Sequence, residues 1–274
     1  MTQSTPVPSL LASVRVARPP LAVAWAGAQA LFFREVLSRV TASRGAWLWL
    51  VLEPIAHVCF LMTVFGFIFH RTIAGIDGAL FVMTGLLGFF LFRNTALRSM
   101  AAIQANQALF AYRQIRPIDT VLVRALVELV LSLLCSVVLV AGAVLLGYAS
   151  VPVDMLHAGA AWLGLWLLGL GLGLVLSALG ALVPEVAKLA GLMMTPLYFV
   201  SGVMVPANAI PQPWRDMLLL NPVMQGLESL RAGWFSQFHA ANGTGMGYVY
   251  AWGLVALLLG MGLHLRFANR LASA

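Results

Sequence analysis

The chain has 274 residues, of which 61% are hydrophobic and only 9% are charged, and its net charge is +7. A soluble domain typically carries about 25% charged residues, so this composition excludes a water-soluble globular protein. The long apolar runs are continuous and do not alternate with period two, which predicts membrane-spanning helices and not an outer-membrane barrel. Cys59 and Cys135 both fall inside apolar runs, where we expect buried free thiols.

Residues 1–33 are expected to form a tail and the beginning of an interface helix. Residues 1–20 are polar and proline-rich, and the apolar stretch 21–33 is too short to cross a bilayer. With its upstream arginines the stretch imitates a signal peptide, but an amphipathic helix at the membrane interface is the preferred interpretation. This helix would continue through four charged residues, Arg34, Glu35, Arg39 and Arg44. The alternative is a disordered basic tail.

Residues 34–274 are expected to form one membrane domain with six transmembrane helices. Six apolar runs come near the ~20 residues that a bilayer requires. They are residues 47–69, 79–100, 121–148, 158–183, 189–205 and 248–267. The fifth run is short and contains Pro196, which favours a kink. In the fourth run, the spacing Gly169-x-x-x-Gly173 permits close packing of another helix.

The basic residues predict the orientation of these spans. With the N-terminus in the cytoplasm, the cytoplasmic side holds eleven basic residues, in loops or near span ends, and the other side holds three, which satisfies the positive-inside rule. The cytoplasmic set is Arg15, Arg18, Arg34, Arg39, Arg44, Arg113, Arg116, Arg124, Lys188, Arg266 and Arg270. Both termini are therefore expected in the cytoplasm.

The connection 206–247 is the longest outer segment. Residues 214–220 and 223–238 have apolar residues at helical spacing but are too short to cross the membrane. We expect two short re-entrant helices hinged at Asn221-Pro222. The alternative is a surface loop whose aromatic residues anchor it at the interface.

Motifs for catalysis and for ion coupling are absent from the sequence. The single lysine, Lys188, follows Ala187, so a nucleotide-binding P-loop is excluded, and no metalloprotease or serine-hydrolase motif is present. The acidic residues, Glu128 among them, are expected near span ends or in loops, which argues against a proton relay through the bilayer. A transporter of this composition must take its energy from a partner. The basic inner segment 106–119 would be the part that such a partner moves.

Several polar and aromatic residues are candidates for a substrate path. Arg93 and Arg98 lie toward the inner half of the second span, and a polar patch there would suit an anionic substrate. The alternative is that they snorkel to the headgroups. Phe89, Phe92 and Tyr198 could stack on sugar rings, although packing is the commoner role of such aromatics.

The ordered features of residues 34–267 together resemble the membrane subunit of ATP-binding-cassette type-2 exporters, specifically those for capsular polysaccharide or O-antigen. The residues that carry the resemblance are Arg34-Glu35, Ser43-Arg44-Gly45, Trp47, Glu53-Pro54, Asn106, Leu109, Pro117, Ser201-Gly202-Val203, Ile210-Pro211, Asn221-Pro222 and Glu228-Ser229-Leu230-Arg231. One departure is that arginine and tyrosine are sparse before the first span, which bears on the substrate and not on the fold.

The resemblance implies a mechanism and a set of partners. Residues 34–274 would be a permease domain, two copies would form a twelve-span channel in the bacterial inner membrane, and each copy would dock a cytoplasmic P-loop ATPase that binds the ATP and magnesium. The chain itself would hold no cofactor or metal and would not be an enzyme. A periplasmic adaptor and an outer-membrane pore would complete the system, and the cargo would be a lipid-linked acidic polysaccharide, not nucleic acid.

The resemblance also implies roles for individual residues. The ATPase-coupling set is Asn106, Leu109, Tyr112, Arg113, Arg116 and Pro117. The channel set is Phe89, Phe92, Arg93, Arg98 and Tyr198. The set for a periplasmic gate is Trp214, Asn221, Pro222, Arg231 and Trp234.

Three other functions stay open at this stage. A type-2 permease could carry O-antigen, teichoic acid or a small drug or lipid instead. A membrane-embedded transferase would need a polar catalytic cluster at one face of the bilayer, which is not visible in the sequence. A scaffold without transport activity would not need the polar residues of the second span.

Overall fold

The protein is almost entirely helical. The computed structural model describes residues 20–41, 45–68, 72–111 and 115–273. The first half contains α1 (Pro20–Val40), α2 (Ala46–Thr63), the π-helical turn η1 (Val64–Ile68), β1 (Thr72–Ile73), β2 (Ile76–Asp77), α3 (Gly78–Met100), α4 (Ala102–Ala105) and the 3-10 helix η2 (Gln107–Ala111). The second half contains α5 (Pro117–Leu145), α6 (Met155–Leu182), α7 (Pro184–Val200), the 3-10 helix η3 (Ala207–Ala209), α8 (Trp214–Leu218), α9 (Pro222–Trp234), α10 (Met246–Arg266) and α11 (Ala268–Ser273).

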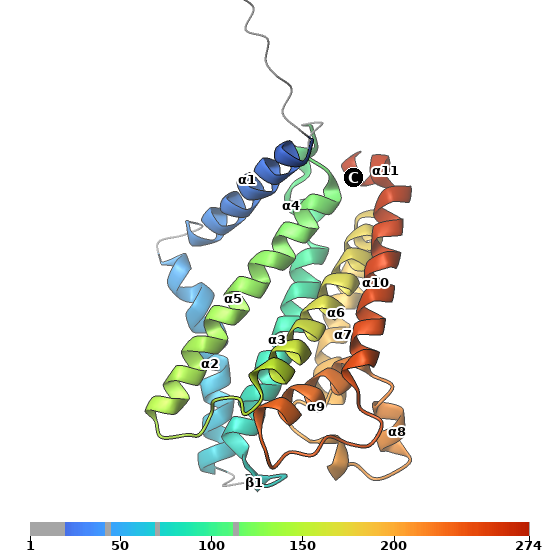
Figure 1. The fold of residues 1–274 in the computed structure, drawn as a ribbon. Helices are drawn as coiled ribbons and strands as arrows, with labels where there is room; N and C mark the ends of the chain where they lie inside the picture. The colour runs from blue at the N-terminus through green and yellow to red at the C-terminus, as the bar shows by residue number, and fades with distance from the viewer. Residues whose placement is uncertain (1–19, 42–44, 69–71, 112–114, 274) are drawn as a thin grey trace, which may run out of the picture.

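The short elements gather at the two ends of a bundle of long helices (Figure 1). One end holds α1, α4 and α11 with the C-terminus, and the opposite end holds the β1–β2 hairpin, α8 and α9. This arrangement places the described parts of the inner segment, residues 106–111 and 115–119, at the same end as α1, and the connection 206–247 at the other end. The grouping agrees with the predicted alternation of the spans.

Among the residues that the structure describes, four helices are long and apolar enough to cross a membrane, namely α3, α5, α6 and α10. They confirm four of the six predicted spans, with ends shifted by a few residues. The other two predicted spans are also helical, but they are the shorter helices α2, whose apolar part is Val51–Gly66, and α7, which has 17 residues.

Local sequence signals explain where the helices begin. The Asp77 side chain accepts a hydrogen bond from the backbone N–H of Ala79 at the start of α3, and Asp154 does the same for His157 in α6. These carboxylates satisfy backbone donors that lack a partner in the first turn of a helix. At α5, Pro117 occupies the first helical position, where its missing N–H costs no hydrogen bond.

Helix α6 is the centre of the bundle, since it packs most extensively against α10 and α3 and also against α9. Its glycines allow this close contact. A β-carbon at Gly169 would lie 2.7 Å from the carbonyl oxygen of Phe92, and one at Gly173 would lie 2.5 Å from the β-carbon of Ser99. The predicted role of the Gly169-x-x-x-Gly173 spacing in close helix packing is therefore confirmed.

The fifth predicted span ends earlier than expected. It was predicted to reach residue 205, but α7 stops at Val200. Gly202 has φ of +72°, a left-handed conformation that favours glycine and turns the chain away from the helix axis.

The outer connection contains the two expected short helices, α8 and α9, with Asn221-Pro222 between them. Helix α9 differs from the expected amphipathic helix, because nearly all of its side chains are buried against α6, α3 and α10. Charged and amide residues that would face solvent on an amphipathic helix instead bind neighbouring backbone here.

Candidate functional site

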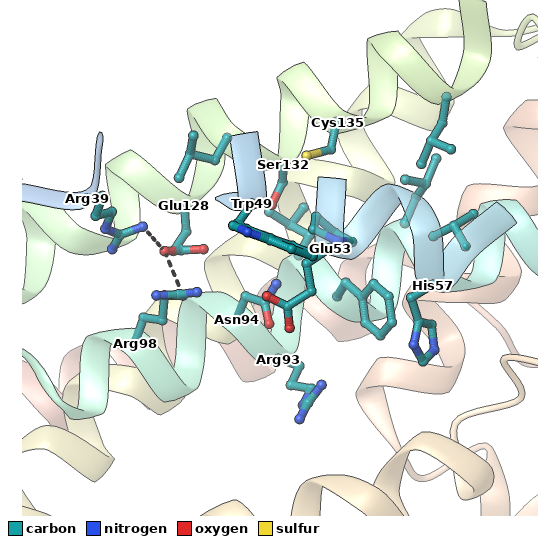
Figure 2. A pocket seen from close by; sticks show the side chains of 17 residues that line it. Arg39, Trp49, Glu53, His57, Arg93, Asn94, Arg98, Glu128, Ser132 and Cys135 are labelled. Carbon is teal, nitrogen blue, oxygen red and sulfur yellow. Dashed lines mark hydrogen bonds and ion pairs between the residues drawn. The ribbon is translucent and has the colours of Figure 1, made fainter. Parts of the chain in front are cut away.

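A cavity of about 420 Å³ lies between α2, α3 and α5, with α1 at one end (Figure 2). Its lining combines charged, polar and apolar side chains. They are Arg39, Trp49, Glu53, Pro54, His57, Val58, Leu87, Phe90, Leu91, Arg93, Asn94, Arg98, Glu128, Leu131, Ser132, Cys135 and Leu139. This volume falls in the range of small-molecule sites.

The lining changes from charged to apolar along the helices. Arg39, Arg98 and Glu128 lie at the end next to α1. Further along α3 and α5, away from α1, the wall is formed by Leu87 and Leu139. The cavity is therefore an amphipathic site and not a uniformly polar channel.

A network of ion pairs closes the charged end. Arg39 pairs with Glu128 and also with Glu35, at 3.0 Å. Arg98 Nε lies 3.3 Å from Glu128 Oε1, and Arg124 Nε lies 3.0 Å from Glu35 Oε1. Figure 2 shows Arg39 and Arg98 converging on the same carboxylate.

Burial decides how much these ion pairs matter. The side chains of Arg39 and Glu128 are only 10% and 4% exposed, whereas that of Arg98 is 52% exposed. Removing one partner of a buried pair leaves an uncompensated charge, while an exposed pair contributes little. Glu128 is therefore the residue on which the network depends.

This network was not predicted from the sequence. Glu128 lies further inside its helix than expected, because α5 begins at Pro117 and not near residue 121. A signal was nevertheless present. Glu35 and Arg39 are four residues apart, as are Arg124 and Glu128, so each pair lies on one face of its helix.

Helix α1 is also joined to the inner segment predicted to contact an ATPase. Arg34 Nη1 donates to Asn106 Oδ1 at 2.9 Å, and Asn106 Nδ2 donates to the carbonyl oxygen of Ala102 at 2.8 Å. Leu109 packs on a small apolar cluster that contains Leu31 of α1. The segment and α1 are thus linked by both polar and apolar contacts.

The remaining coupling candidates differ in accessibility. Arg116 is exposed, and Pro117 is buried at the start of α5. The backbone N–H of Arg116 donates to Asp119 Oδ2 at 3.0 Å, which leaves the guanidinium group outside the helix cap. Tyr112 and Arg113 lie outside the described residues.

The structure divides the predicted channel residues into two groups. Arg93 and Arg98 line the cavity. Phe89 and Phe92 are buried in the main hydrophobic core, and Tyr198 of α7 packs edge-on against Phe89 with ring centroids 5.2 Å apart. Within one chain these three aromatics hold α3 against α7 and do not line the cavity.

The predicted gate residues are mostly anchors in this structure. Trp214 is exposed, but Trp234 is buried and its Nε1 donates to the carbonyl oxygen of Ser150 at 2.7 Å. Asn221 caps α9 by accepting from the backbone N–H of Val223, and its amide donates to Ser201 Oγ. Pro222 is the first residue of α9.

Arg231 is fully buried in α9. Its guanidinium donates to the carbonyl oxygens of Gly202, at 2.8 Å, and Val203, at 2.6 Å, and lies 3.7 Å from the centre of the Phe81 ring. Glu228, also buried, accepts from the backbone N–H groups of Ala207 and Ala241. These two residues tie the turn after α7 and the loops on either side of α9 to that helix.

The cysteines differ from the expectation. Both are free, but Cys59 is exposed on α2, and only Cys135 is buried, beside the cavity. The expectation of a buried Cys59 was wrong, because α2 packs through another face. Within the described residues, no group of three or more histidine, cysteine, aspartate or glutamate side chains could hold a metal ion.

Comparison with known proteins identifies the family. The model of the ABC-2 type transporter family matches residues 27–235, from within α1 to just beyond α9. The chain belongs to the ABC-2 type transporter family. The ion-pair network, the cavity and the outer connection as far as residue 235 lie inside the matched region of this ABC-2 chain.

Several named proteins are similar to this ABC-2 chain. The Escherichia coli polysialic acid transport protein KpsM is 35% identical over 236 residues, which cover 86% of this chain and 91% of that protein. The capsule polysaccharide export inner-membrane protein CtrC of Neisseria meningitidis is 27% identical over 88% of this chain and 90% of its own length. Haemophilus influenzae BexB, a protein of the same description, is 27% identical over 85% and 87%.

Proposed function

We propose that this chain is the membrane subunit of an ATP-driven exporter that moves a lipid-linked capsular polysaccharide from the cytoplasm to the periplasm. The observation that carries the proposal is the 35% identity to a polysialic acid transport protein over nearly the full length of both chains. Relatives named for capsule polysaccharide export at the inner membrane support the same cargo and the same location.

The proposed channel is a homodimer with six spans in each copy. Helices α2 and α7 would complete the set begun by the four longer helices. Both termini would face the cytoplasm, as the distribution of basic residues favours. The short outer helices α8 and α9 would be re-entrant, and α1 would lie at the inner interface.

Energy would come from a cytoplasmic P-loop ATPase that binds the ATP and magnesium. Its proposed contact is the inner segment from Asn106 to Pro117, supported by the exposed guanidinium of Arg116 and by the contacts between this segment and α1. A force applied to the segment would reach α1 through Arg34 and Asn106. A periplasmic adaptor and an outer-membrane pore would receive the polymer.

Helix α3 is the proposed wall of the polymer path. Arg93 and Arg98 would supply positive charge beside a negatively charged glycan. Phe89, Phe92 and Tyr198 would support this wall from behind by fixing α3 against α7. At the outer end, α9 would be the fixed part of a gate, since Arg231 and Trp234 anchor it, and exposed Trp214 would lie on the moving part.

The coupling assignment is tested by Arg116→Glu. The charge reversal should abolish surface polysaccharide while the chain still reaches the membrane, because the helix cap uses only the backbone of Arg116. Arg116→Lys keeps the charge and should retain export. If export survives the Glu substitution, the contact lies elsewhere.

A further inference from the structure

The cavity between α2, α3 and α5 has the size and polarity of a site for the headgroup and part of the acyl chains of one amphiphile. It occupies about 420 Å³ within a single chain, which is too small for a polymer. Its charged end lies next to α1, and its apolar end lies deeper between α3 and α5. A membrane lipid has the same order, with a charged headgroup at the interface and acyl chains below it.

The charge of the lining favours an anionic headgroup. Three arginines, Arg39, Arg93 and Arg98, face two glutamates, Glu53 and Glu128, which leaves a net positive charge. Arg39 is occupied by Glu35 and Glu128. Arg93 has no hydrogen bond or ion pair with any described residue, and Figure 2 shows it apart from the paired cluster. Arg98 is half exposed and has a single carboxylate partner.

The cavity is also accessible from the bilayer. Trp49 and Glu53 of α2 line it and are exposed, so it reaches the protein surface. The outer faces of the two bordering helices are apolar, with exposed Phe60 on α2 and exposed Leu133 and Val137 on α5. A lipid could therefore enter sideways without passing an aqueous phase.

We propose that the cavity binds the headgroup and the upper acyl segment of one anionic phospholipid from the bilayer leaflet at α1, and that Arg93 and Arg98 supply the positive charge that attracts its phosphate. Arginine suits this role because its planar guanidinium donates charge-assisted hydrogen bonds to phosphate oxygens. Under the proposed function, Arg93 and Arg98 lie beside the exported polysaccharide. The phospholipid would be a second ligand of the same two residues. Its binding can be measured without export or an ATPase.

A phosphate at Arg98 would compete with Glu128. Arg98 reaches Glu128 at 3.3 Å, and the same carboxylate holds Arg39 of α1. Occupancy of the cavity would thereby alter the ion pairs between α1, α3 and α5. The lipid would act as a positioning ligand for α1.

The test uses the purified full-length chain in detergent, stripped of lipid and titrated with phosphatidylglycerol or phosphatidylcholine. Native mass spectrometry counts the bound lipids. We expect one tightly bound phosphatidylglycerol molecule for each chain and no phosphatidylcholine bound with similar affinity. The double variant Arg93→Gln/Arg98→Gln should bind phosphatidylglycerol about tenfold more weakly or worse. Inorganic phosphate alone should not displace the lipid, because it cannot fill the apolar end.

Two controls separate the cavity from general surface binding. The variant Arg266→Gln/Arg270→Gln removes two exposed charges outside the cavity and should bind as the wild type does. Ser132→Trp should block the cavity while all arginines stay, whereas Ser136→Trp, one turn further along α5 and not in the lining, should not. The proposal would be overturned if the wild type bound both lipids equally. It would also be overturned if Arg93→Gln/Arg98→Gln and Ser132→Trp each bound phosphatidylglycerol as the wild type does. An equal loss of phosphatidylglycerol binding in Arg93→Gln/Arg98→Gln and in Arg266→Gln/Arg270→Gln would overturn it as well.

Discussion

Glu128 forms ion pairs with arginines of two other helices at the inner end. Its carboxylate pairs with Arg39 of α1 and with Arg98 of α3. Glu35 also pairs with Arg39, and in addition with Arg124 of α5. Three helices are therefore connected through two carboxylates. Since neither Glu35 nor Glu128 is more than 11% exposed, water screens these contacts poorly.

Glu128→Gln should lower the stability of the protein. The amide keeps the shape of the side chain but leaves Arg98 without a carboxylate and Arg39 with Glu35 alone. We expect a loss of about 2 kcal/mol, reduced from the full cost of a broken buried pair because Arg98 is half exposed. Thermal unfolding of the purified chain measures it. Glu185→Gln, an exposed residue at the start of α7, is the matched control, and an equal shift in both variants would show that Glu128 has no special role.

Arg231 gives a second prediction for a single residue. Arg231→Lys keeps the positive charge but cannot reproduce the planar donor pair that binds the carbonyl oxygens of Gly202 and Val203. We expect a loss of about 1.5–3 kcal/mol and faster proteolysis of residues 201–245. Arg215 lies in the same outer connection and forms a loose ion pair with its neighbour Asp216 at 4.0 Å, so Arg215→Lys should leave both unchanged. Unchanged proteolysis of the Arg231 variant would contradict the anchoring role.

At the scale of elements, the contact of α6 with α3 depends on glycine. Gly169→Ala should destabilise the protein by about 1–3 kcal/mol, because the new methyl group would meet the backbone carbonyl of Phe92, which cannot rotate away. Gly159 lies on the same helix, and a β-carbon there would have open space around it. Gly159→Ala should therefore leave the stability of the protein unchanged or raise it slightly. The apparent unfolding temperatures of the two variants decide the matter, and equal temperatures would refute close packing at Gly169.

The sequence predicted the elements better than the contacts between them. Apolar runs located the long helices, because the thickness of the bilayer sets the length of a spanning helix. The ending of α7 at Val200 escaped prediction because an apolar run alone does not show that Gly202 turns the chain. The burial of α9 also escaped, since charged residues such as Arg231 suggested a surface.

The candidate site was predicted only in part. Arg93 and Arg98 stood out because charges are rare in apolar runs, and both line the cavity. The apolar half of the cavity and the partners of Glu128 depend on how α1, α2, α3 and α5 pack together. Such long-range packing leaves no mark on any single stretch of the sequence.

Across the whole molecule, we propose that the inner end receives force from a partner, while hydrogen bonds hold the outer end together. The inner end holds α1, α4, η2 and α11. Arg34 of α1 binds Asn106 between α4 and η2, and α11 contacts η2. The outer end is tied together by Arg231, Glu228 and Trp234. The central claim is that a separate ATPase supplies the work at the inner end.

That claim is tested most directly by purifying the tagged chain from its native membrane in mild detergent and identifying what accompanies it. We predict a P-loop ATPase at equal copy number, with a rate of ATP hydrolysis that falls in the Arg116→Glu variant and is retained in Arg116→Lys. Recovery of the chain without any ATPase under several mild detergents would contradict the account.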